Sequence, residues 1–161
     1  MIFRQAAKEE IPSLFEEGYQ EWSKNRTFAQ YCLDNSKDDI IGTRYVIEEN
    51  GRIVSSAVLL RLKSRLGKDV YGLGSILTSR RHRGKGYGIE LIKKCMNLIP
   101  PENSILFLYS DINPSYYEKF GFQSLPDELQ KYAKSVCMAY CHESVWNELI
   151  QANGDDIPGY F

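Results

Sequence analysis

The residues best suited to chemistry lie between Ser79 and Ile89, where cationic side chains run into closely spaced glycines. The cations are Arg80, Arg81, Arg83 and Lys85, and the glycines are Gly84, Gly86 and Gly88. An apolar run ending at Thr78 precedes this loop, and a helical pattern follows it from Gly86 to Ile99. Glycines let the backbone approach a ligand closely, and the first N–H groups of a helix can point at phosphate oxygens. The segment therefore predicts a site for a phosphate-bearing ligand.

Two familiar nucleotide-binding loops do not fit this segment. A P-loop requires the pattern G-x-x-x-x-G-K-[ST], which the chain does not contain. A dinucleotide-binding fingerprint requires G-x-G-x-x-G near the first strand, whereas these glycines have another spacing and lie in the middle of the chain. We therefore expect neither motif to bind the phosphates.

A second chemically promising segment runs from Asn113 to Phe122 and contains two adjacent tyrosines, Tyr116 and Tyr117. Adjacent residues cannot share one face of a helix, so at most one of them serves a given site. An ordinary tyrosine has a pKa of about 10 and keeps its proton at neutral pH, which suits protonation of a departing thiolate. The alternative is that the aromatic residues only pack a short helix, as we expect of Phe120 and Phe122.

These two segments resemble the markers of the GCN5-related N-acetyltransferase (GNAT) family. The residues Arg83, Gly84, Lys85, Gly86, Tyr87 and Gly88 match that family's R/Q-x-x-G-x-G/A motif. The run from Tyr117 to Phe122 is similar to its Y-E-K-x-G-F segment, and one expected helix and one expected strand lie between the two, in the family's order.

The resemblance implies that acetyl-CoA is the donor and that the amine of a small molecule is the acceptor. It implies that backbone N–H groups from Arg83 to Gly88 hold the CoA pyrophosphate and that Tyr117 protonates the CoA sulfur. It also implies that the pantetheine arm pairs with the strand before the loop. The strand residues concerned are Ile76, Leu77 and Thr78.

The general base is the weakest point of this resemblance. Many relatives draw it from the strand before the loop, but Val70 to Thr78 contains no Asp or Glu. Asp111, at the end of the next expected strand, is our candidate base, although an Asx turn or helix N-cap role before Asn113 is the better-supported reading. Acidic and aromatic residues of the first two helices, Glu21 among them, could attract a cationic amine on the acceptor side, but an ordinary amphipathic helix is the favoured interpretation.

Composition and element order predict a single mixed α/β domain over residues 1–161, with 153–161 as an irregular tail. The GNAT-like arrangement would be a mostly antiparallel sheet of six or seven strands with about four helices. The net charge of −1 argues against nucleic-acid binding, and no apolar stretch is long enough for a membrane span. The beginning of the chain lacks a signal-peptide pattern, so we expect a cytoplasmic protein without disulfides.

Three further expectations concern cofactors and partners. Cys137, Cys141 and His142 lack the ligand spacing of a zinc site, so we expect no metal. A homodimer is compatible with exposed terminal strands and with Val145 to Ile150. Two other functions stay open: a protein or peptide N-acetyltransferase, and a CoA-binding module without catalysis.

Overall fold

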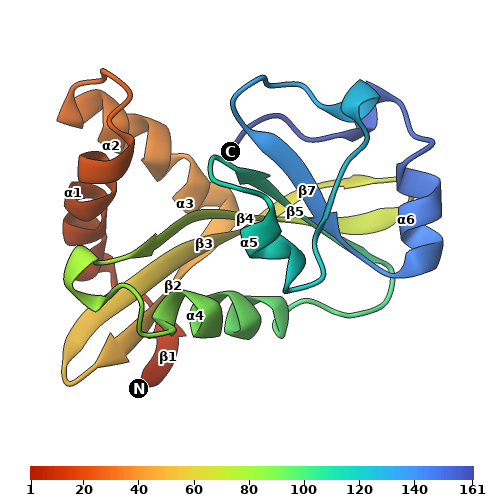
Figure 1. The fold of residues 1–161 in the computed structure, drawn as a ribbon. Helices are drawn as coiled ribbons and strands as arrows, with labels where there is room; N and C mark the ends of the chain where they lie inside the picture. The colour runs from red at the N-terminus through yellow and green to blue at the C-terminus, as the bar shows by residue number, and fades with distance from the viewer. The chain divides into compact units, whose positions relative to one another are not determined.

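The computed structural model describes residues 1–161 and contains one seven-stranded sheet with six α-helices (Figure 1). The strands occur in the sheet in the order 1-2-3-4-5-7-6. Their bounds are β1 Ile2–Gln5, β2 Gly42–Glu49, β3 Arg52–Arg65, β4 Lys68–Thr78, β5 Ser104–Ser110, β6 Gln123–Ser124 and β7 Val136–Tyr140. The helices are α1 Ile11–Trp22, α2 Phe28–Ser36, α3 Asp38–Ile41, α4 Tyr87–Met96, α5 Ser115–Glu118 and α6 Glu143–Leu149.

The pairing of the strands confirms the predicted fold class. β1 with β2, β2 with β3, β5 with β7, and β6 with β7 are antiparallel, whereas β4 and β5 are parallel. Asn50 and Gly51 both have positive φ between β2 and β3, as the Asn-Gly pair predicts for a tight hairpin. The fold is thus a mixed α/β fold with a mostly antiparallel sheet.

The chain falls into two compact units. Unit 1 comprises Met1–Leu60 and Ser75–Leu98, and unit 2 comprises Arg61–Gly74 and Ile99–Phe161. Both β3 and β4 therefore pass from one unit into the other. Each unit is described by itself below.

In unit 1, α1 packs beside α2, as Figure 1 shows. Leu14 and Phe15 of α1 are buried, as their helical spacing predicts, and Trp22 is half-buried. Gly18 faces the side chain of Tyr31 on α2, where an ideal Cβ would lie 2.2 Å from the tyrosine hydroxyl. A glycine at this position lets the two helices approach each other closely.

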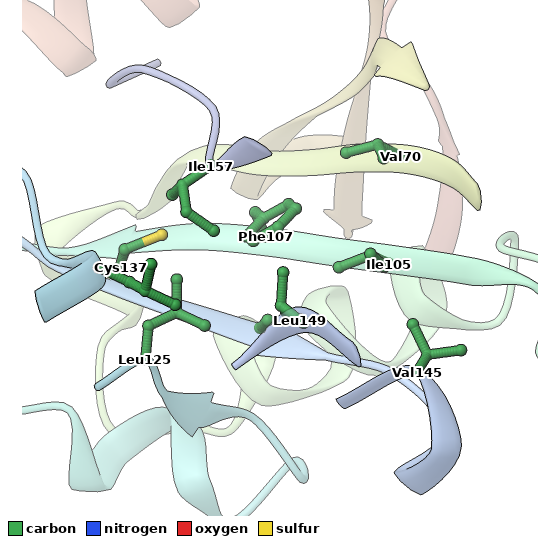
Figure 2. Packing of buried hydrophobic residues seen from close by; sticks show 10 residues of the cluster. Val70, Ile105, Phe107, Leu125, Cys137, Val145, Leu149 and Ile157 are labelled. Carbon is green, nitrogen blue, oxygen red and sulfur yellow. The ribbon is translucent and has the colours of Figure 1, made fainter. Parts of the chain in front are cut away.

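Unit 2 has its own apolar core, built on β4, β5 and β7 (Figure 2). Val145 and Leu149 of α6 belong to this core, so the apolar face that the sequence offered for a homodimer packs within the chain instead. Ile157 is also in the core, and Gly154–Asp156 forms a 3₁₀ turn. The predicted irregular tail is therefore partly ordered and anchored.

Several elements differ from the sequence expectations. β3 and β4 extend beyond the apolar runs that predict them, Ile53 to Leu62 and Val70 to Thr78. They are joined by Leu66 and Gly67, both with positive φ. The helix expected to reach Ile99 ends at Met96, before Pro100 restricts the backbone. The single-turn helix α3 and the two-residue strand β6 have no clear periodic signal because they are so short.

Candidate functional site

The end of β4 is irregular at Ser75, which has a φ of +48° although it is not a glycine. The register of β4 with β5 covers Asp69 to Gly72, so Ile76, Leu77 and Thr78 lie beyond it. The strand contains Gly72 and Gly74, and glycine inside a strand favours a bulge or a close approach of another group. The irregular residue is Ser75 instead, and Gly72 meets the ring of Phe161, whose nearest atoms would lie 2.8 Å from an added Cβ.

Side chains of unit 1 contact the backbone at this strand end. The Leu77 carbonyl accepts a hydrogen bond from Ser55 Oγ at 2.8 Å, and Ser55 Oγ also lies 3.0 Å from Thr78 Oγ1. The Thr78 carbonyl accepts a hydrogen bond from Arg83 Nε at 3.0 Å. These bonds fix the strand end against β3 and tie it to the loop that follows.

The loop between β4 and α4 presents backbone rather than side chains at the helix start. Gly84 and Gly86 have φ values of +76° and +86°, in the left-handed region that favours glycine, and no atom lies within 4 Å of an added Cβ at either position. Gly86 is the N-cap residue of α4 and provides no side-chain cap. The N–H groups of the first helical turn consequently have no intrahelical acceptor and can receive an anion.

Two of the four loop cations are already paired. Arg80 Nε lies 2.8 Å and an Arg83 terminal nitrogen 3.0 Å from the same oxygen, Oε1 of Glu21 on α1. The hydrogen bond from Arg80 is the main cause that lowers the pKa of Glu21. Sequence reasoning placed Glu21 on the acceptor side and missed this contact, because no local spacing connects it to the loop.

His82 is held within the same loop. Its Nδ1 lies 2.6 Å from Ser79 Oγ, and its ring centroid lies 6.3 Å from that of Tyr87. Burial raises the pKa of Glu17, one turn before Glu21 on α1, and His82 opposes that shift. These contacts hold the His82 ring within the loop.

In unit 2, Tyr117 lies on α5 and is only 8% exposed. Its ring packs edge-to-face against Tyr116 and Phe122, with centroid distances of 5.1 and 6.3 Å. Burial, with smaller contributions from Tyr116 and Asp111, raises the pKa of Tyr117 to about 12. The phenol therefore stays protonated at neutral pH and can serve as a proton donor.

Asp111 is also in unit 2 and has long-range partners. Ser135 Oγ donates a hydrogen bond to its Oδ1, and the Tyr160 hydroxyl donates to its Oδ2 at 2.9 Å. The Asx-type role considered for Asp111 belongs to Asn113, whose Oδ1 accepts a hydrogen bond from the Ser115 N–H at 3.0 Å. Sequence reasoning missed Ser135 and Tyr160, which no motif connects to Asp111.

The predicted site residues thus gather in two groups. Ile76 to Gly88 form the strand end, loop and helix start of unit 1, and Tyr117 and Asp111 belong to unit 2. Residues 1–161 contain no cluster of three or more His, Cys, Asp or Glu side chains that could hold a metal ion. None of the helices is long and apolar enough to cross a membrane.

Several solved structures share the fold of this chain. An acetyltransferase of Corynebacterium glutamicum, described as histone acetyltransferase HPA2 and related acetyltransferase, has a TM-score of 0.66 at 16% identity over 86% of this chain and 94% of its own. Glucosamine-6-phosphate N-acetyltransferase of Arabidopsis thaliana has a TM-score of 0.61 at 18% identity over 82% of this chain and 97% of its own. The same plant's Naa50, bound to the bisubstrate analogue CoA-Ac-MVNAL, has a TM-score of 0.65 at 13% identity over 88% and 98%.

These structural likenesses show a shared fold, and no curated protein sequence matches the chain. The acetyltransferase (GNAT) family model, however, matches residues 4–122, a range that includes both the glycine loop and the Tyr117 segment. With that match and the fold in agreement, the chain belongs to the GNAT acetyltransferase family.

Proposed function

We propose that this protein transfers an acetyl group from acetyl-CoA to the amine of a small-molecule acceptor, in the cytoplasm. The observation that carries the proposal is the uncapped start of α4 behind Gly84 and Gly86, where open backbone N–H groups fit a pyrophosphate. Bound acetyl-CoA supplies the activated acetyl group as a thioester.

In this proposal the loop from Arg83 to Gly88 holds the pyrophosphate through backbone N–H groups. Lys85 is an exposed residue of the loop and adds a positive charge, and its ammonium group can meet a phosphate from several directions. Ile76, Leu77 and Thr78 receive the pantetheine arm along the strand end, where Ser55 and Arg83 already fix the backbone. A fixed strand end positions the reacting groups, and positioning is a main source of catalysis in two-substrate reactions.

In this proposal two residues of unit 2, Tyr117 and Asp111, act as proton donor and proton acceptor. Tyr117 donates its phenolic proton to the sulfur that leaves, and its raised pKa keeps that proton available at neutral pH. Asp111 accepts the proton that the acceptor amine loses. β4 begins at Lys68 and so includes Asp69, but that carboxylate lies before the strand segment that precedes the loop and is paired with Arg61 at 2.7 Å.

The first test is calorimetric binding of acetyl-CoA to the wild-type protein and to Gly86→Asp and Gly86→Asn variants. Asn and Asp both tolerate positive φ, so the two variants differ mainly in charge. One unit charge about 4 Å from a phosphate charge costs about 1 kcal/mol in water and more where water is excluded. We therefore expect Gly86→Asp to bind about 5- to 50-fold more weakly than Gly86→Asn.

Gly51 offers a matched control in the same unit, because it also has positive φ and no atom within 4 Å of an added Cβ. Gly51→Asp and Gly51→Asn should bind acetyl-CoA as the wild type does. Equal affinity of the two Gly86 variants would remove the helix start from the site, and no binding by the wild type would remove the donor. Amine and peptide acceptors can then be compared by release of free thiol.

A further inference from the structure

Glu21 on α1 contacts the glycine loop through a single carboxylate oxygen. One carboxylate oxygen receives two guanidinium groups, from Arg80 at 2.8 Å and from Arg83 at 3.0 Å. Arg83 is held a second time, because its Nε donates to the Thr78 carbonyl. The Glu21 side chain is 23% exposed, so it is better shielded from water than either arginine.

The two arginines are among the cations that the sequence offers to phosphate. Because both converge on one oxygen, they can surround an anion. The anion that they surround in this structure is the carboxylate of Glu21. A phosphate group arriving at the loop meets cations whose charge Glu21 already offsets, together with the negative charge of Glu21 itself.

We propose that Glu21 is an internal counter-anion that weakens the hold of the loop on the phosphates of CoA. This inference rests on the proposed acetyl-CoA site. Its functional consequence concerns the product: an anion that shares Arg80 and Arg83 lowers the affinity for CoA and speeds its release after transfer. Product release limits turnover in many enzymes, so such a residue favours turnover over tight binding.

Glu21→Gln is the decisive variant, because it removes the charge and keeps the shape and a hydrogen-bond acceptor. Because Glu21 and the two arginines are partly exposed, solvent screens their charges and the effect should be moderate. We expect CoA and acetyl-CoA to bind to this variant about 3- to 10-fold more tightly than to the wild type, mostly through slower dissociation. Glu21→Asp keeps the charge and should stay within about 2-fold of the wild type. Glu16→Gln removes the same charge from an exposed position on α1 outside this contact and should leave affinity unchanged.

The experiment is calorimetric titration of each folded variant with CoA and acetyl-CoA, with dissociation followed by surface plasmon resonance. A purely structural role for Glu21 predicts the opposite sign, because loss of the ion pairs would loosen the loop and weaken binding. Unchanged or weaker binding by Glu21→Gln, with normal wild-type binding, would overturn the counter-anion role and leave the acetyl-CoA site intact. Absence of binding in both proteins would overturn the two proposals together.

Discussion

Gly18 provides the sharpest stability test of the helix pair that carries Glu21. A Cβ at position 18 would lie 2.2 Å from the hydroxyl oxygen of Tyr31, which is 3% exposed, and 3.3 Å from its ring carbon Cζ. Gly18→Ala therefore forces α1 and α2 apart or moves a buried ring, at a cost of about 1–3 kcal/mol. Alanine in a helix offsets about 1 kcal/mol of this. We expect a net destabilisation of about 0–2 kcal/mol.

Removing the hydroxyl should reverse that result. In a Tyr31→Phe background the nearest atom to the new Cβ is the ring carbon Cζ, at 3.3 Å, a distance that a small shift can relieve. Gly18→Ala should then be neutral or stabilising by up to about 1 kcal/mol. The coupling energy between the two substitutions should be about 1–3 kcal/mol. Urea denaturation followed by circular dichroism measures all four proteins of this cycle. Additive effects, with the same cost of Gly18→Ala in both backgrounds, would refute the packing argument.

Three further predictions concern the proton donor and the thiols. Tyr117→Phe should lower turnover about 10²–10⁴-fold while calorimetric affinity for acetyl-CoA stays within about 2-fold. Because the pKa of Tyr117 rises from 10.0 to about 12 on folding, its contribution to stability is complete below pH 10 and is lost as pH rises through 12. Cys95, Cys137 and Cys141 also have raised pKa values and remain in both proteins, so both should lose stability between pH 9 and about 12, and the wild type should lose more than Tyr117→Phe. Burial raises the pKa of Cys95 and Cys137 to about 12, so at pH 8 a thiol reagent should label the half-buried Cys32 first and those two only after unfolding.

The sequence predicted the main architecture because its signals are local. The Asn50-Gly51 turn, the apolar spacing of α1 and the glycines before α4 each specify a backbone conformation through neighbouring residues, and the structure has all three. The two motifs, Arg83 to Gly88 and Tyr117 to Phe122, then indicated the family, which the family model confirms. The assigned roles of Tyr117 and Asp111 remain predictions.

What sequence reasoning missed depends on pairs that are distant in the chain. Nothing near Glu21 indicates that it meets Arg80, and nothing near Asp111 indicates Ser135 or Tyr160. Gly72 illustrates the same limit: a glycine in a strand indicates a bulge or a close approach, but it does not indicate that the approaching group is the ring of Phe161. Such contacts depend on the fold as a whole, and local propensity carries no information about them.

The interleaving of the two units has a consequence for synthesis on the ribosome. All residues of unit 1 have been made once Leu98 is translated, whereas the hairpin segment Arg61–Gly74 belongs to unit 2 and needs Ile99–Phe161. Until then Val70 lacks its core partners Ile105 and Phe107, and an isolated two-stranded hairpin is only marginally stable. A nascent chain therefore passes through an interval in which Val70 and its neighbours in Arg61–Gly74 have been made but lack their core partners, and that interval is where we expect a chaperone to be most useful.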